Sequence, residues 1–95
     1  MTLLESTYRQ LRGVQLVSCA ETFSINYLGK NKNWYAFQTH RERDFSVDAA
    51  VQCLRSIRTN KALDGLDAKQ QAALRAAERA LLEHLNTQHC VADVI

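Results

Sequence analysis

The chain has 95 residues, a length that supports one hydrophobic core and predicts a single domain over 1–95. Its hydrophobic fraction of 46% and charged fraction of 23% are those of a globular protein and exclude a disordered chain. The chain begins without the apolar segment of a signal peptide, and no window is long enough to span a bilayer. We therefore expect a cytoplasmic protein that makes no membrane contact.

The three cysteines also favour a reducing compartment. Cys19, Cys53 and Cys90 are odd in number, far apart and outside any C-x-x-C pair. A secreted domain of this size would usually carry an even and denser set of cysteines. The sequence leaves the role of these three thiols open.

The first predicted element is a short helix over residues 2–12. Leu4, Tyr8 and Leu11 recur at i, i+4 and i+7, and a glycine follows where the helix would end. The β-branched and apolar residues of 14–19 then favour a strand that could join a sheet.

Two segments with alternating apolar and polar residues, about 22–28 and 34–40, predict a β-hairpin. A period of two places every second side chain on one face of a strand. The stretch between the segments is rich in glycine and asparagine, which tolerate the positive φ of a tight turn. The residues expected to face the core are Phe23, Ile25, Tyr27, Tyr35 and Phe37.

The rest of the chain predicts two longer helices, about 46–58 and 67–87. Ser46 is a natural N-cap for the first, and Asp67 with Gln70 gives the second a start like a capping box. The expected fold class is therefore α+β, with a small antiparallel sheet covered by two helices and preceded by a short helix. The alanine-rich second helix and the apolar tail after it favour a homodimer.

Positive charge is concentrated in the middle of the chain. Residues 29–61 hold seven basic and three acidic side chains, whereas the remainder holds five basic and seven acidic ones. Lysine and arginine neutralise phosphates, glutamine can pair with adenine, and tryptophan can stack on a base. We therefore predict a nucleic-acid-binding surface made of Lys30, Lys32, Trp34, Gln38, His40, Arg41, Arg43, Arg55, Arg58 and Lys61.

Other functions are weighed against this one. A basic hairpin tip can simply be solvated, and Trp34 with Tyr27 could instead anchor a protein–protein interaction module, an inhibitor or adaptor. His40, Glu42 and Asp44 alternate as metal ligands on a strand would, but interleaved arginines and weak spacing argue against a metal site. No catalytic or phosphate-loop motif occurs, so we expect neither an enzyme nor a bound cofactor.

The order strand, helix, loop, helix over residues 34–87 resembles the ribbon–helix–helix repressors of the Arc type. In that family, strands from two subunits pair antiparallel and lie in the major groove, where alternate polar side chains read bases. The resemblance implies that Gln38 and His40 read bases, with Trp34 or Arg41 flanking them. The chain departs from the family in its upstream strand partner and its longer loop between the helices. The resulting expectation is a small DNA-binding regulator, with DNA favoured over RNA as the partner.

Overall fold

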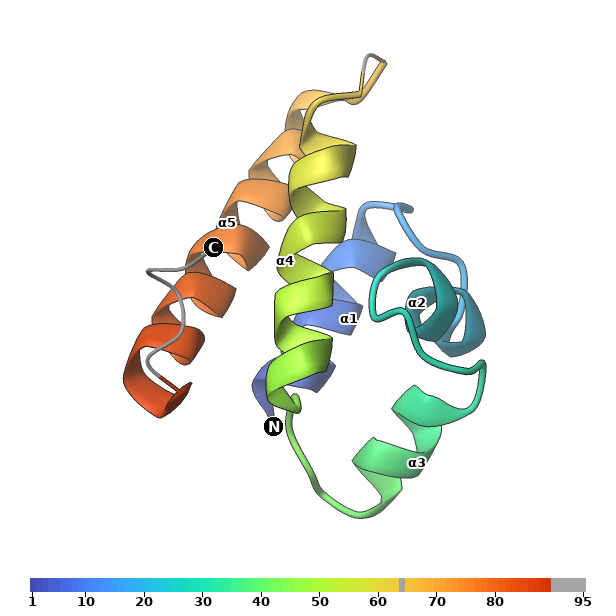
Figure 1. The fold of residues 1–95 in the computed structure, drawn as a ribbon. Coiled ribbons are helices and arrows are strands. Elements are labelled where there is room, and N and C mark those ends of the chain that lie inside the picture. Colours follow the sequence, from blue (N-terminus) through green and yellow to red (C-terminus); the bar gives the residue numbers. More distant parts are fainter. Residues whose placement is uncertain (64, 90–95) are drawn as a thin grey trace.

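The computed structural model describes residues 1–63 and 65–89, and every regular element in these ranges is a helix (Figure 1). The predicted α+β fold with an antiparallel sheet is therefore wrong. A π-helical turn, η1, continues the last α-helix directly. The elements of the described ranges are α1 (Leu3–Gly13), α2 (Ala20–Asn26), α3 (Trp34–His40), α4 (Val47–Lys61), α5 (Ala68–His84) and η1 (Leu85–His89).

The predicted hairpin falls on α2 and α3, and the predicted strand over 14–19 is a connection of turns and bends. Phe23 in α2 and Tyr27 at its C-cap are both buried, as a strand or a helix would place them, because i and i+4 share a face in either. Ile25 distinguishes the two structures, since a strand would bury it and it is 54% exposed. Phe37, also predicted to face the core, is 53% exposed.

The helices predicted from capping signals are confirmed. The Ser46 hydroxyl accepts a hydrogen bond from the Ala49 N–H, and α4 continues three residues beyond the predicted end at 58. At the start of α5, the Asp67 carboxylate accepts the Gln70 N–H at 2.8 Å, and the Gln70 side chain accepts the Asp67 N–H at 3.1 Å. The short helix at the N-terminus is also confirmed as α1. The apolar tail (91, 94 and 95) and Cys90 lie outside the described residues.

In the view of Figure 1, α4 runs through the middle of the molecule, with α5 on one side and α2 and α3 on the other. Helix α5 packs against both α4 and α1, and α2 packs against α3. None of the described helices has the length and apolar character needed to traverse a bilayer. The largest fully buried side chains of the core are Leu4, Leu11, Phe23, Leu28, Leu54, Ile57, Leu74, Leu81 and Leu85.

The start of α3 is held by α2. The Tyr35 N–H, in the first turn of α3, donates to the buried Ser24 hydroxyl at 3.1 Å, which satisfies a donor that the helix itself leaves free. The connection turns at Gly29, whose φ is +64° and whose added Cβ would lie 3.0 Å from Gln52 Cγ. Both the positive φ and the close approach favour glycine here.

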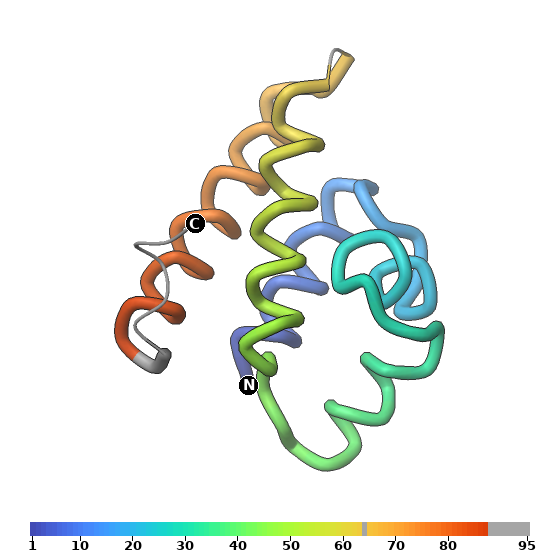
Figure 2. The backbone as a smooth tube through the Cα atoms, viewed as in Figure 1, coloured from blue at the N-terminus to red at the C-terminus, as the bar shows by residue number. Residues whose placement is uncertain are grey.

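The end of α3 is held by the loop that follows it. The Asp44 carboxylate in this loop accepts hydrogen bonds from the Leu3 and Leu4 N–H groups at 3.2 and 2.9 Å. These donors lie at the N-terminal end of α1, where a negative charge is favourable. Figure 2 accordingly shows the N-terminus beside the start of α4. With both ends tied to other helices, α3 has a fixed orientation on the fold.

Candidate nucleic-acid interface

One side of α3 is open to solvent along the whole helix. We call this surface the α3 face; its residues recur at i, i+3, i+4, i+7 and i+8, which is the spacing of one side of a helix. All of them are exposed, and they begin at the N-cap position. The α3 face consists of Asn33, Ala36, Phe37, His40 and Arg41.

The opposite side of α3 is used for packing. The Tyr35 ring lies 4.6 Å from the Tyr8 ring and 5.6 Å from the Phe23 ring, measured between centroids. Burial raises the pKa of Tyr35 to about 12, so its hydroxyl stays neutral at physiological pH. Gln38 is buried, and its Nε2 donates to the Asp44 carbonyl at 3.1 Å. The amide predicted to read a base is therefore engaged within the fold.

Three of the predicted basic residues lie on or beside the α3 face. Lys32 precedes α3, Arg41 ends it and Arg43 follows it, and all three are exposed. None of them forms an ion pair with a carboxylate of residues 1–63 or 65–89. The Arg41 guanidinium carbon lies 4.1 Å from the centroid of the Phe37 ring, in the geometry of a cation–π contact. These cations remain available for an anionic partner.

Lys30 is differently placed. Its ammonium group pairs with Asp48 and lies 5.8 Å from the centroid of the Trp34 ring. The hydrogen bond from Lys30, helped by one from Ser46, lowers the pKa of Asp48 to about 2. Asp48 therefore compensates much of the positive charge of Lys30, even though Lys30 lies close to α3.

The predicted basic run near the end of α4 does not join the α3 face. The Arg58 Nε lies 2.9 Å and the Lys61 Nζ 2.7 Å from the carboxylate of Glu78 on α5. The hydrogen bond from Lys61, together with Arg58, holds the pKa of Glu78 below its usual value. Figure 1 shows this end of α4 at the top, whereas α3 lies near the other end of the helix. Arg55 is exposed and lines a separate hollow with Tyr27.

Two arginines that the sequence did not single out lie beside α3. Arg9 and Arg12 are exposed on α1 and line a hollow of about 590 Å³ together with Tyr8 and Tyr35. Within the described ranges neither arginine pairs with a carboxylate, and the Arg12 Nη1 donates to the Tyr8 hydroxyl at 3.3 Å. Only tertiary packing brings these residues to α3, because more than twenty residues separate Arg12 from Tyr35.

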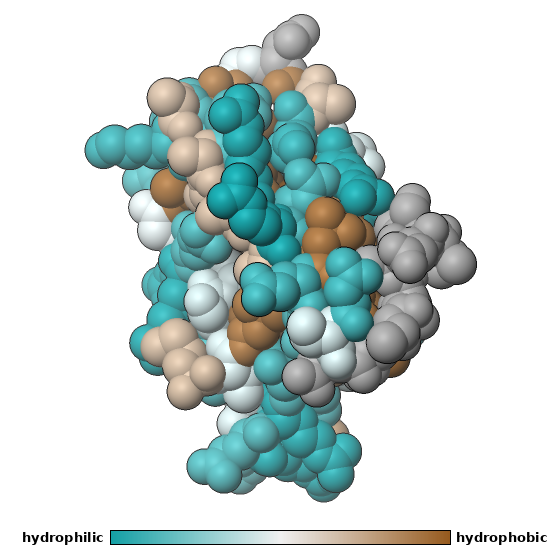
Figure 3. Space-filling view, turned by 90° about the vertical axis from the view of Figure 1, so that its left-hand side faces the viewer, coloured by the Kyte–Doolittle hydropathy of each residue, from teal (hydrophilic) through white to brown (hydrophobic). Residues whose placement is uncertain are grey.

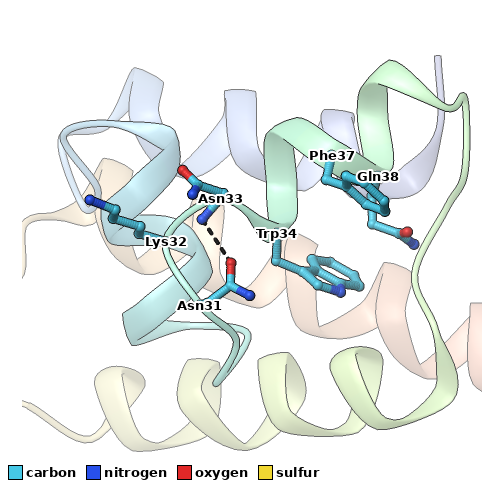
Figure 4. A pocket seen from close by; sticks show the side chains of 6 residues that line it. All are labelled: Asn31, Lys32, Asn33, Trp34, Phe37 and Gln38. Carbon is cyan, nitrogen blue, oxygen red and sulfur yellow. Dashed lines mark hydrogen bonds between the residues drawn. The ribbon is translucent and has the colours of Figure 1, made fainter.

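A second hollow of about 480 Å³ opens at the N-terminal end of α3 (Figure 4). The loop before α3 forms one wall, and the first turns of α3 form the other. Trp34 is half-buried here, and the exposed Phe37 ring contributes apolar surface. The hollow is lined by Asn31, Lys32, Asn33, Trp34, Phe37 and Gln38.

The other candidate sites have less support. Tyr27, predicted as an anchor for a protein partner, is buried in the core at 4% exposure. No three metal-ligating side chains gather anywhere in residues 1–63 or 65–89, and Asp44 is committed to backbone donors. Burial raises the pKa of the Cys53 thiol to about 12, while a hydrogen bond with Thr22 lowers the pKa of the exposed Cys19.

Figure 3 views the side of α5 and shows a largely hydrophilic surface with small apolar patches. It keeps the vertical axis of Figure 1, and its lowest part, where the loop after α3 lies, is a hydrophilic protrusion. At the α3 face, exposed cations lie beside the exposed Phe37 ring.

These features describe a small helical protein in which α2 packs against α3 and the outer side of α3 is exposed to solvent. The sequence matches DUF6626, a family of unknown function, over residues 4–94, and the chain belongs to this family. No curated protein and no solved structure matches the chain.

Proposed function

We propose that the protein binds double-stranded DNA through the α3 face, with α2 and α3 acting as a helix-turn-helix pair. The observation that carries the proposal is the exposed outer side of α3 between cations that no carboxylate of the described residues neutralises. In helix-turn-helix proteins the second helix enters the major groove, and the first crosses the sugar–phosphate backbone. The DNA-binding role is inferred from the arrangement of the helices and from their charge. Because a fold alone does not establish a function, the titration described below measures DNA binding itself.

The proposal moves the DNA contact from the predicted strand to a helix. The segment that was expected to be the DNA-reading strand of a ribbon–helix–helix repressor forms the helix α3. The proposal therefore does not use the resemblance to that family. The connection from 27 to 33 is longer than the three or four residues usual between such helices. Ser24 and Gly29 nevertheless fix how α3 leaves α2, which provides the rigid placement that base recognition needs.

The proposal divides the residues near α3 into two roles. Phosphate contacts set register and strength, whereas contacts to base edges set sequence preference. The Asn33 side chain makes no capping hydrogen bond and can pair with adenine, and His40 can donate to or accept from a base edge. The proposed phosphate contacts are Arg9, Arg12, Lys32, Arg41 and Arg43.

Duplex DNA fits this surface better than RNA does. The major groove of B-form DNA is wide enough to admit an α-helix, whereas the groove of A-form RNA is deep and narrow. The role that we propose for such DNA binding is that of a regulator. A homodimer, which would double the contact on a two-fold symmetric site, stays a prediction.

A titration at two salt concentrations tests the proposed function. Fluorescently labelled duplex DNA, single-stranded DNA and duplex RNA of mixed sequence would each be titrated at about 50 and about 200 mM salt. We expect the duplex DNA to bind tightest and its affinity to fall roughly 10²- to 10³-fold, as four or five phosphate contacts imply. Absence of duplex binding at the lower salt concentration would contradict the proposal. A protein partner that contacts the Phe37 ring and binds with an affinity insensitive to salt would instead favour the alternative of a protein–protein interaction module.

A further inference from the structure

We infer that Ala36 and Phe37 recognise the methyl groups of thymine, so that the protein prefers A·T base pairs. This inference rests on the proposed function and adds a base preference to it. The two residues occupy the middle of the α3 face, the part of the helix that would lie deepest in the groove. Neither side chain can donate or accept a hydrogen bond.

The chemistry of the major groove gives such side chains one target. Thymine alone among the four bases carries a methyl group there, and apolar side chains such as alanine and phenylalanine contact it. An unmethylated pyrimidine presents only a C5 hydrogen at this place and offers Phe37 less apolar surface to contact. A helix with Ala36 and Phe37 at the centre of its DNA-facing side should therefore favour thymine over cytosine at the bases that it contacts.

Phe37 is held in a position that suits this contact. Its ring is 53% exposed although it is one of the largest apolar side chains of the chain. The Arg41 guanidinium packs on the ring at 4.1 Å, and the ring also lines the hollow at the start of α3. An exposed phenylalanine ring can make the apolar contact that a thymine methyl group offers.

The neighbouring polar residue points to the same base pair. Asn33 lies three residues before Ala36 and four before Phe37, so it shares the α3 face with both. An asparagine amide can bond to both N6 and N7 of adenine. An amide for adenine beside apolar groups for thymine makes the α3 face complementary to A·T pairs.

The test compares duplexes that differ only in the methyl group. An alternating A·T duplex, the same duplex with deoxyuridine in place of every thymidine, and an alternating G·C duplex would be titrated with the full chain. Each methyl contact contributes about a fourfold change in affinity, so the thymidine duplex should bind about four- to tenfold tighter than the deoxyuridine duplex. The G·C duplex should bind more weakly than the thymidine duplex.

Variants separate a direct contact from an effect of the methyl group on DNA shape. Phe37→Ala should reduce the preference for thymidine to nearly onefold while leaving the salt dependence, because the phosphate contacts remain. Ile25→Ala is the matched control, since Ile25 is 54% exposed on α2 and lies outside the α3 face. It should keep the full preference. Circular dichroism of each variant would establish that the fold is retained.

The outcomes distinguish this inference from the proposed function. Equal binding of the thymidine and deoxyuridine duplexes, with a steep salt dependence, would overturn the inference and leave the proposed function standing. A preference that survives in Phe37→Ala would also overturn it. Failure to bind any duplex would overturn the proposed function itself.

Discussion

Reversing the charge of the two arginines at the end of α3, with Arg41→Glu and Arg43→Glu, is expected to weaken binding to duplex DNA at least about 100-fold. Two favourable phosphate contacts are lost and two repulsive ones are introduced. The slope of log affinity against log salt should become shallower by about 2, since each phosphate contact contributes about 0.9. Fluorescence anisotropy over a range of salt concentrations measures both quantities. The fold should be unaffected, because both side chains are exposed and form no ion pair with the described residues.

A matched variant on α5 controls for net charge. Arg75→Glu with Arg79→Glu changes the formal charge by the same amount, and both side chains are exposed. In the view of Figure 1, α5 lies on the other side of α4 from α3. We expect this variant to lose only a fewfold in affinity, through long-range attraction alone. Equal losses in the two variants would mean that the α3 face has no special role.

The second large effect concerns stability. Phe23→Ala should lower the free energy of unfolding by about 3–5 kcal/mol, a large share of the roughly 5–15 kcal/mol available to a protein domain. Phe23 is completely buried, and its ring contacts the rings of Tyr8, Tyr27 and Tyr35. Removing the ring leaves a cavity where α1, α2 and α3 meet. Urea unfolding followed by circular dichroism measures the loss.

Ile25→Ala provides the comparison for Phe23→Ala. A β-strand would place residues 23 and 25 on the same buried face, so both substitutions would be costly. Of these two residues of α2 only Phe23 is buried, and Ile25→Ala should change the free energy of unfolding by no more than about 0.5 kcal/mol. Comparable losses for the two variants would contradict the helix.

Local signals in the sequence were enough to predict three of the helices. The cap at Ser46 and the capping box of Asp67 and Gln70 are made by residues three positions apart, so the sequence alone reveals them. The sequence predicts strands where the two short helices lie. In the first segment Phe23 and Tyr27 fit both periods, and in the second the alternation does not follow burial, because Phe37 is 53% exposed. A period-two pattern in seven residues cannot exclude a helix unless the middle residue is known to be buried.

The candidate site could be predicted only in part, for a related reason. Lys32, Arg41 and Arg43 are predicted because positive charge is concentrated on both sides of residues 34–40, whichever structure that segment adopts. The burial of Gln38 against the Asp44 carbonyl depends on how the chain folds back, and so does the pairing of the α4 cations with a carboxylate on α5. Charge counted along the sequence shows where cations are, but tertiary contacts determine which of them remain available.

Chemical-shift mapping tests most directly whether α3 contacts DNA. Backbone amide signals of the full chain would be followed by NMR while an alternating A·T duplex is added at low salt. We expect the largest changes in residues 31–43, smaller ones at Arg9 and Arg12, and almost none in the middle of α5. Changes centred on α5 or on the end of α4 near Lys61, with residues 31–43 unaffected, would contradict the assignment of α3 as the DNA-binding helix.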